Sequence, residues 1–142
     1  MIKVKFRGQK VDSKEWVYGY VYFGIPETHI TYIIPEWIYN GYEYEQQKEF
    51  SLRFEKYEQV EPTTVGMFIG LKDKNGKEIY ADDIVGDFGD PNCFKIVWDK
   101  KYAAFGYIIQ NNNSTTISEI TEDFLNDQEV IGNIHDNPEL LG

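Results

Sequence analysis

The sequence predicts a mainly β protein made of antiparallel strands, and three observations lead to this prediction. Short apolar and aromatic runs recur between turn signals at roughly ten-residue spacing, which is typical of an antiparallel barrel or sandwich. Phe, Trp and Tyr make up 16% of the 142 residues, and these types favour pleated strands. Strands do not alternate with long helical patterns, so an α/β fold is not expected.

We expect two parts, an N-terminal β lobe over residues 1–61 and an SH3-like β-barrel over residues 62–142, which together can form one compact unit. Pro62 and the two threonines after it mark the boundary. From residue 65 onward, five short strands fit a small barrel. A chain of this length can bury a sufficient core without a metal or a disulfide.

The N-terminal lobe begins with two predicted strands. Apolar and basic side chains alternate over residues 2–7, which predicts a strand with its apolar face buried and its basic face in solvent. Residues 16–23 are rich in Tyr and Val and predict the next strand. Gly19 in its middle indicates a bulge or the close approach of another backbone.

The rest of the lobe is less regular. Residues 30–39 predict a strand whose Pro35 belongs at an edge or a bulge, because proline donates no ladder hydrogen bond. Asn40-Gly41 predicts a hairpin turn. Residues 43–58 fit either a strand or a helix, and their aromatic content favours a strand from Phe50.

Two turns organise the C-terminal part. Asn75 and Gly76 can adopt the positive φ angles of a tight hairpin turn. Asp82 and Asp83 form a second turn before a strand that starts at Ile84. These four residues, Asn75, Gly76, Asp82 and Asp83, are therefore predicted to have a structural role.

Further strands complete the predicted barrel. Residues 94–98 and 102–109 predict a third hairpin, and residues 129–134 a last strand. Between them, residues 121–123 can start a short helix. The terminal segment 137–141 has Asn as a cap and proline at the first helical position, which predicts a helical turn.

The charge balance and the single cysteine limit where the protein is expected to act and what it is expected to bind. The chain has 14 basic and 24 acidic residues, for a net charge of −10, which repels nucleic acid at long range. Cys93 has no intramolecular partner, so a reducing cytosol is expected. The N-terminus lacks the apolar run of a signal peptide, and no stretch reaches the length of a membrane span.

Reactive and metal-binding arrangements are not expected. An acidic cluster invites a calcium interpretation, but with Gly76 at the sixth loop position the first position is Leu71, which has no side-chain oxygen. The members of this cluster are Asp73, Asn75, Glu78, Asp82 and Asp83. Cys93, His29 and His135 are far apart in sequence and match no catalytic or zinc motif. The sequence thus predicts no catalytic residue, metal or cofactor, and no enzyme.

Aromatic side chains are the more informative feature. Four of them crowd one predicted hairpin turn, where a small core cannot bury them all, and such rings supply interface area or stack on bases. The candidate interaction surface therefore consists of Trp37, Tyr39, Tyr42 and Tyr44, with the basic residues Lys3, Lys5 and Arg7. Core or edge packing of these rings is the alternative.

Several motifs resemble the YopX family of phage and prophage proteins. They are Gly70 to Tyr80, Asp83 to Val85, Thr64 to Gly66, Val130 to Ile134, Asn137 to Leu141, Ile2 to Arg7 and Trp16 to Tyr20. This chain differs from the usual family pattern at residues 67–69, at Asp82 in place of glycine and at His135 in place of an aromatic residue. The resemblance implies an SH3-like barrel in the C-terminal half, a phage or prophage origin and self-association, but no known reaction.

We therefore expect a noncatalytic phage-encoded accessory protein, located in the cytoplasm of a host bacterium, that binds itself or another phage or host protein. The alternative is a role with nucleic acid. It would act either by direct binding through the basic residues Lys3, Lys5 and Arg7, or by mimicry of DNA through the acidic C-terminal half.

Overall fold

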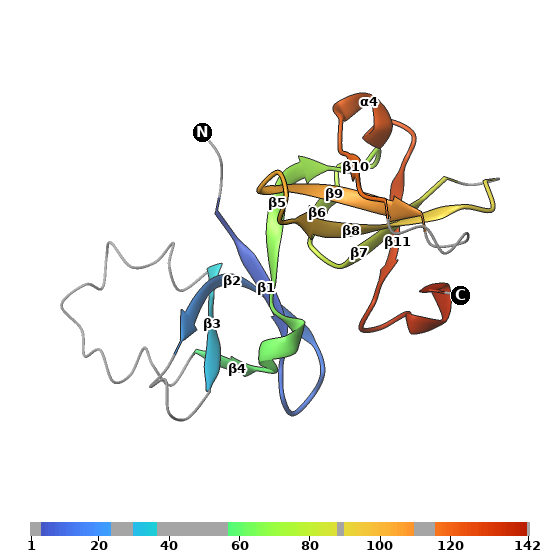
Figure 1. Cartoon of the computed structure of the whole chain (residues 1–142). Helices are drawn as coiled ribbons and strands as arrows, with labels where there is room; N and C mark the ends of the chain where they lie inside the picture. Colours follow the sequence, from blue (N-terminus) through green and yellow to red (C-terminus); the bar gives the residue numbers. More distant parts are fainter. Residues whose placement is uncertain (1–3, 24–29, 37–56, 88–89, 110–115, 142) are drawn as a thin grey trace. The chain divides into compact units, whose positions relative to one another are not determined.

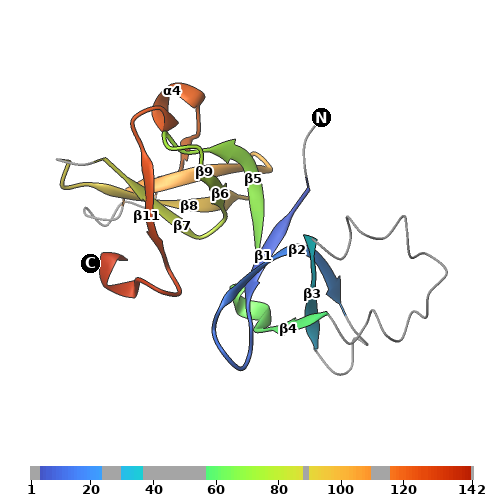
Figure 2. The ribbon, with the colours of Figure 1, turned by 180° about the vertical axis from the view of Figure 1, so that it is seen from behind.

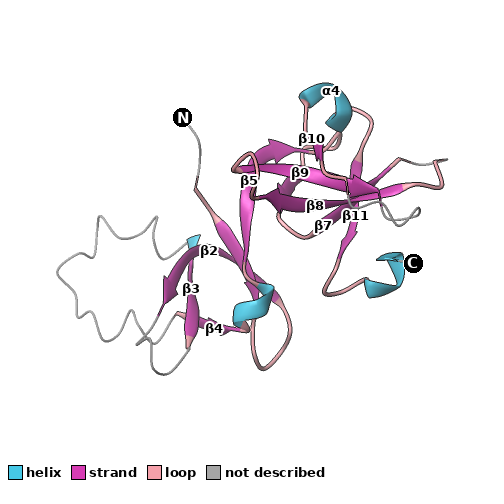
Figure 3. Cartoon of the chain, viewed as in Figure 1, coloured by secondary structure: helices cyan, strands magenta, loops and turns pink. Residues whose placement is uncertain are grey.

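The structure, a computed structural model, describes residues 4–23, 30–36, 57–87, 90–109 and 116–141. The chain divides into an N-terminal unit, up to Met67, and a C-terminal unit, from Phe68 onward (Figure 1). The boundary that the sequence predicts, between residues 61 and 62, lies before this division. Most described elements are strands, and helices are few and short (Figure 3). The prediction of a mainly β, antiparallel protein is confirmed.

Four described strands form the sheet of the N-terminal unit. They are β1 (Phe6–Gln9), β2 (Trp16–Phe23), β3 (Thr31–Pro35) and β4 (Glu58–Val60), in the order β4-β3-β2-β1. All neighbouring pairs are antiparallel. The predicted Asn40-Gly41 turn and the segment from Phe50 to residue 56 lie outside the described residues.

Hydrogen bonds also join the end of β1 to β4. Lys10 forms a bridge with Val60, and the Glu61 N–H donates to the Gln9 carbonyl at 2.9 Å. The short 3-10 helix η2 (Pro62–Thr64) follows, and the Thr64 hydroxyl accepts the Gln9 N–H at 2.9 Å. The chain leaving β4 is thus held against β1 before it enters β5.

Gly19 lies where another backbone approaches, as the sequence predicts. It pairs with Pro35 across β2 and β3, and a Cβ atom at this position would collide with the Ile34 carbonyl oxygen. Only glycine leaves room for this register.

The predicted orientation of the first strand is wrong. Lys5 and Arg7 are only 7% and 5% exposed, whereas Val4 is 49% exposed. The two basic side chains are buried because each has a specific contact. Lys5 Nζ lies 3.2 Å from Glu36 Oε2, and the Arg7 guanidinium lies 4.5 Å from the centre of the Trp16 ring.

The C-terminal unit contains most of the remaining strands. They are β5 (Gly66–Lys72), β6 (Glu78–Tyr80), β7 (Asp83–Gly86), β8 (Cys93–Asp99), β9 (Ala104–Ile109), β10 (Ser118–Glu119) and β11 (Glu129–Asn133). The first two residues of β5 pair with β1 in the N-terminal unit, and β5 then pairs with β6. The other five form a sheet in the order β10-β9-β8-β7-β11. Figure 2 shows β11 beside β7 from behind.

An apolar core fills the C-terminal unit. Ile79, Val85, Ile96 and Leu125 are fully or almost fully buried and contact one another. They come from β6, β7, β8 and the helix α4 (Glu122–Leu125). The ring of Phe124 stacks on Tyr107 with centroids 4.0 Å apart, so α4 is tied to β9.

The helical segments are short. Thr121 caps α4 by accepting the Phe124 N–H at 3.1 Å. The last described element is the 3-10 helix η3 (Pro138–Leu141), at the terminal turn that the sequence predicts. Among the described residues, no helix is long and apolar enough to cross a membrane. The strand pairings described here do not close the five-stranded sheet into a barrel.

Candidate functional site

The hairpin of β8 and β9 presents aromatic side chains on its surface. Trp98 and Tyr102 are 51% and 71% exposed. Trp98 pairs with Phe105 across the hairpin, and their rings meet edge to face with centroids 5.1 Å apart. Lys101 Nζ lies 5.4 Å from the centre of the Tyr102 ring. The hairpin therefore combines exposed rings with a cation already placed over one of them.

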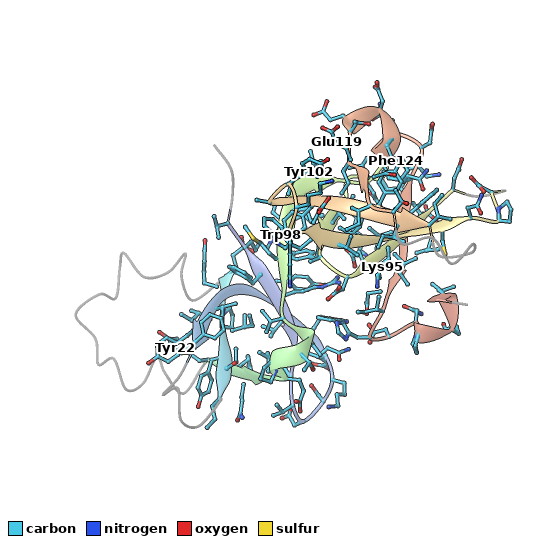
Figure 4. The ribbon with its side chains drawn as sticks, viewed as in Figure 1. Tyr22, Lys95, Trp98, Tyr102, Glu119 and Phe124 are labelled. Carbon is cyan, nitrogen blue, oxygen red and sulfur yellow. The ribbon has the colours of Figure 1, made fainter. Side chains whose placement is uncertain are left out.

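A pocket of about 380 Å³ lies beside this hairpin, within the C-terminal unit. Its walls come from the end of β8, the start of β9, and the strand β10 with the residue before it. Its lining residues are Asp99, Tyr102, Ala104, Phe105, Gly106, Ile117, Ser118 and Glu119. Figure 4 labels Tyr102 and Glu119 from this set and also Trp98. We call it the hairpin pocket.

Local sequence explains why the hairpin pocket forms. Asp99 Oδ1 accepts the Lys101 N–H at 2.9 Å, which starts the turn, and Ala103 adopts a φ of 51° within it. Gly106 then allows β10 to come close, because a Cβ at this position would lie 2.7 Å from the Ser118 carbonyl oxygen. Glycine is therefore required where β9 meets β10.

The chemistry of the hairpin pocket is that of an aromatic wall with two carboxylates. Phe105 and Tyr102 contribute ring surface, while Asp99 and Glu119 contribute negative charge. Glu119 is exposed and Asp99 is partly exposed, so both carboxylates are accessible to water. Such a site suits a cation with an apolar or flat body.

The predicted turn at Asn75 and Gly76 is built around Asp73. Asp73 Oδ1 accepts the N–H groups of Asn75 and Lys77, both at 2.9 Å, and Oδ2 accepts the Val130 N–H at 2.9 Å. Gly76 has a φ of 83°. The carboxylate thus joins the β5–β6 turn to β11.

These contacts change the acidity of Asp73. Burial by itself would raise its pKa, but the N–H groups of Val130, Lys77 and Asn75 stabilise the charged form, and the Lys77 charge adds to their effect. The pKa of Asp73 is therefore lowered from its ordinary value of 3.8. The acidic cluster contains a structural carboxylate with backbone partners.

Asp82 and Asp83 form the second turn. Asp82 has a φ of 71°, which aspartate tolerates better than most residues. Its N–H donates to the Ile96 carbonyl at 3.0 Å, and its carbonyl accepts the Ile134 N–H at 3.1 Å. Asp83 is buried, and its Oδ2 accepts the Tyr80 N–H at 2.8 Å. Both residues hold strands together.

The predicted interaction surface is only partly described. Lys3 and the four aromatic residues of that surface, Trp37, Tyr39, Tyr42 and Tyr44, lie outside the described residues. Lys5 and Arg7 lie within them but are buried. Neither side chain is therefore placed on the surface to contact a phosphate, as direct nucleic-acid binding through this strand would require.

The residues considered for nucleophilic or metal chemistry have other surroundings. Cys93 Sγ lies 3.6 Å from the Leu140 carbonyl oxygen, and burial raises the pKa of its thiol, which disfavours the reactive thiolate. His135 Nε2 lies 3.7 Å from Asp82 Oδ2, and His29 lies outside the described residues. Within the described ranges, no group of three or more His, Cys, Asp or Glu residues is arranged to hold a metal ion.

The sequence did not indicate the hairpin pocket. Its walls come from three segments, and β10 has only two residues, Ser118 and Glu119, which is too short for a periodic signal. The available signals were Gly106 within an apolar run and the aromatic residue Tyr102 directly after a charged turn. Only the pairing of β10 with β9 brings these features together.

Comparisons with known proteins give a family and a fold. The crystal structure of protein EF1440 from Enterococcus faecalis is similar over the full length of both chains, with a TM-score of 0.54 and 20% sequence identity. At this identity the similarity concerns the fold alone. No curated protein matches the sequence. The family described as YopX protein matches residues 5–142, nearly the whole length, and the chain therefore belongs to the YopX family.

Proposed function

We propose that this protein is a noncatalytic accessory protein encoded by a phage or prophage, and that it binds other proteins or itself in the bacterial cytoplasm. The observation that carries the proposal is the exposed aromatic surface of the β8–β9 hairpin, with Trp98 and Tyr102 at its centre. Trp and Tyr are enriched among the residues that dominate binding energy in protein interfaces.

The position of these rings supports an interface. A large ring exposed alone is common on protein surfaces, but Trp98, Phe105 and Tyr102 come from one hairpin, and two of them border the hairpin pocket. A hollow next to exposed rings offers a partner both a flat surface and an anchor point.

The N-terminal unit offers a second aromatic surface. Tyr18, Tyr22 and Phe23 on β2 are exposed, and the Tyr22 ring lies 6.2 Å from those of Tyr32 and Tyr57. These rings supplement the proposal without carrying it, since the proposal rests on the rings that border the hairpin pocket.

The proposed architecture includes an SH3-like barrel in the C-terminal unit. The core supports it, because Ile69 and Leu71 of β5 and Ile79 of β6 pack with residues of the five-stranded sheet. A β5–β6 layer that covers one face of the sheet is the arrangement of a small barrel or sandwich.

The protein-binding function is tested by capture and by light scattering. Tagged protein with Trp98→Ser and Tyr102→Ser should lose at least one partner that the native protein captures from lysogenic or infected cells. Light scattering at low and high salt measures self-association of both proteins. Ile131→Ser is the matched control, because it replaces an exposed apolar side chain on β11 in the same unit.

The outcomes separate the possibilities. Loss of a captured partner or of the oligomer in the double variant, but not in Ile131→Ser, supports the proposal. An identical set of partners and an identical mass for all three proteins would contradict it.

A further inference from the structure

The hairpin pocket has a composition that identifies a class of partner, and this inference rests on the proposed protein-binding function. We propose that the hairpin pocket binds an arginine side chain in a basic segment of a partner protein. The ring surfaces of Tyr102 and Phe105 and the carboxylates of Asp99 and Glu119 would recognise it.

Charge complementarity is the first argument for a basic occupant. Two of the lining residues are acidic, and none is basic. Lys100 and Lys101 lie in the turn beside the hairpin pocket, but the chain has no Lys or Arg after Lys101 and its net charge is −10. A basic segment would therefore be attracted at long range and could neutralise charge at the site.

The ring surfaces favour arginine over lysine. A guanidinium group is flat, so it can lie on an aromatic ring while its N–H groups donate to a carboxylate. A lysine ammonium is a compact, strongly hydrated charge and combines these contacts less well. The Tyr102 ring can hold a cation, since Lys101 Nζ lies 5.4 Å from its centre, and the guanidinium of a partner would displace that ammonium.

The size of the hairpin pocket agrees with a single anchoring side chain. Its volume of about 380 Å³ is near the lower end of the range of roughly 300–1,000 Å³ that small-molecule sites have. One side chain of an extended segment can enter, while neighbouring residues of that segment contact Trp98 and Tyr102 on the outer surface of the hairpin.

A partner protein is a better occupant than a second copy of this chain. The sequence has two arginines. Arg7 is buried, and Arg53 lies outside the described residues. A net charge of −10 disfavours the approach of a second copy at long range, so we assign the arginine to a partner, and Arg53→Gln should leave the mass measured by light scattering unchanged. Loss of a dimer in this variant would assign the hairpin pocket to a second copy and contradict the proposal.

The direct test titrates the full ¹⁵N-labelled chain with acetyl-arginine-amide and follows backbone amide signals. Binding should shift the signals of Gly106, Ser118 and Glu119 in a saturable way, with a Kd on the order of 1 mM for such a fragment. Acetyl-citrulline-amide has nearly the same shape without the charge and should bind about tenfold or more weakly.

Variants assign the binding to the hairpin pocket. Asp99→Asn keeps the oxygen that accepts the Lys101 N–H and removes the charge, and Glu119→Gln changes an exposed carboxylate. The double variant should bind acetyl-arginine-amide about tenfold more weakly. Asp127→Asn is the control, because Asp127 is exposed and does not line the hairpin pocket.

Two further variants test the role of the rings. Tyr102→Leu should weaken binding several-fold because it removes an exposed ring surface with little effect on the core. Lys101→Met should strengthen binding, since it removes a competing cation beside that ring. Unchanged affinity in both would contradict the role of Tyr102.

The proposal is overturned if citrulline and arginine probes bind equally, or if the Asp99→Asn and Glu119→Gln double variant binds like the native protein. These outcomes differ from failure of the protein-binding function. If the arginine probe fails but Trp98→Ser and Tyr102→Ser still remove a captured partner, the function stands and only the chemistry assigned to the hairpin pocket is wrong.

Discussion

Among the described residues, both units bury apolar side chains, but only the N-terminal unit also buries positively charged ones. In the C-terminal unit, Ile79, Val85 and Ile96 form a continuous apolar core. In the N-terminal unit, β1 buries Arg7 and Gln9, and Lys5 directly before it is buried as well. A sheet can therefore bury long cations in the place of apolar residues when an acidic or aromatic partner lies opposite.

The buried polar groups also differ in their partners. Asp73 and Asp83 in the C-terminal unit accept backbone N–H groups at turns, which fixes strand ends. Lys5 in the N-terminal unit is paired with a side chain, Glu36, that comes from beyond β3. We expect the C-terminal unit to depend mainly on apolar packing and the N-terminal unit more on side-chain pairing.

The largest expected effect tests the apolar core. Ile96→Ala should lower the free energy of unfolding by about 2–5 kcal/mol, because it leaves a cavity at a fully buried position. Amide hydrogen exchange should show the loss of protection in β7 and β8. Ile33→Ala is the matched change in the N-terminal unit, where Ile33 is equally buried.

Hydrogen exchange after these two substitutions also tests whether the units are independent. Ile33→Ala should expose amides of β2 and β3 more than those of β7 and β8. If each substitution lowers protection equally in both units, the two units unfold together. The difference between their cores would then not give them separate stabilities.

Asp73 provides the next largest effect. Asp73→Asn should lower the free energy of unfolding by about 1.5–3 kcal/mol at neutral pH, because hydrogen bonds to a charged acceptor are stronger than those to a neutral one. The hydrogen bonds that should weaken are those donated by the N–H groups of Asn75, Lys77 and Val130. Urea unfolding measures the difference.

The lowered pKa of Asp73 gives this effect a pH dependence. The charged carboxylate stabilises the fold fully above its ordinary pKa of 3.8, and the contribution is lost as pH falls through the lower pKa of the folded state. The difference between native protein and Asp73→Asn should therefore shrink below about pH 4. A constant difference down to pH 2 would contradict this role.

The pairing of Lys5 with Glu36 tests whether the N-terminal unit depends on side-chain pairing. Lys5→Met, Glu36→Gln and the double variant form a cycle whose coupling energy should be about 0.5–3 kcal/mol. Glu36→Gln alone should destabilise the protein, because it leaves the buried ammonium without this carboxylate. Denaturant unfolding of the four proteins gives the coupling, and a value near zero would mean that the ion pair does not hold β1.

The predicted and observed elements agree at some positions and differ at others, which shows which features sequence patterns can predict. The turn at Asn75 and Gly76 depends on local backbone preferences, and its location follows from a dipeptide. The close approach at Gly19 was also visible, since a glycine between bulky strand residues usually marks a bulge or a neighbouring backbone. In both cases the sequence signal lies in residues next to one another.

The features that the sequence did not predict depend on distant partners. The alternation in residues 2–7 indicates a strand, and the structure has β1 at Phe6–Gln9, but periodicity does not show which face is buried. Glu36 and Trp16 make the basic face the buried one. The hairpin pocket likewise requires β10 to pair with β9 at Gly106, and nothing local indicates that pairing.

Asp82 should give the smallest effects, and a series of substitutions separates its two roles. Asp82→Ala should destabilise the C-terminal unit by about 1–2 kcal/mol, because a φ of 71° is unfavourable for alanine. Asp82→Gly removes that strain but increases the freedom of the unfolded chain and loses the contact with His135, so its stability should remain within about 1 kcal/mol of native.

Asp82→Asn completes this series, because asparagine tolerates the same backbone angle and has no charge. Its difference from native protein therefore measures the contact between the Asp82 carboxylate and His135, which we expect to contribute less than about 1 kcal/mol at this partly exposed site. Thermal and urea unfolding give the order. If alanine proves as stable as glycine, the left-handed angle at Asp82 has no part in joining β7 to β8 and β11.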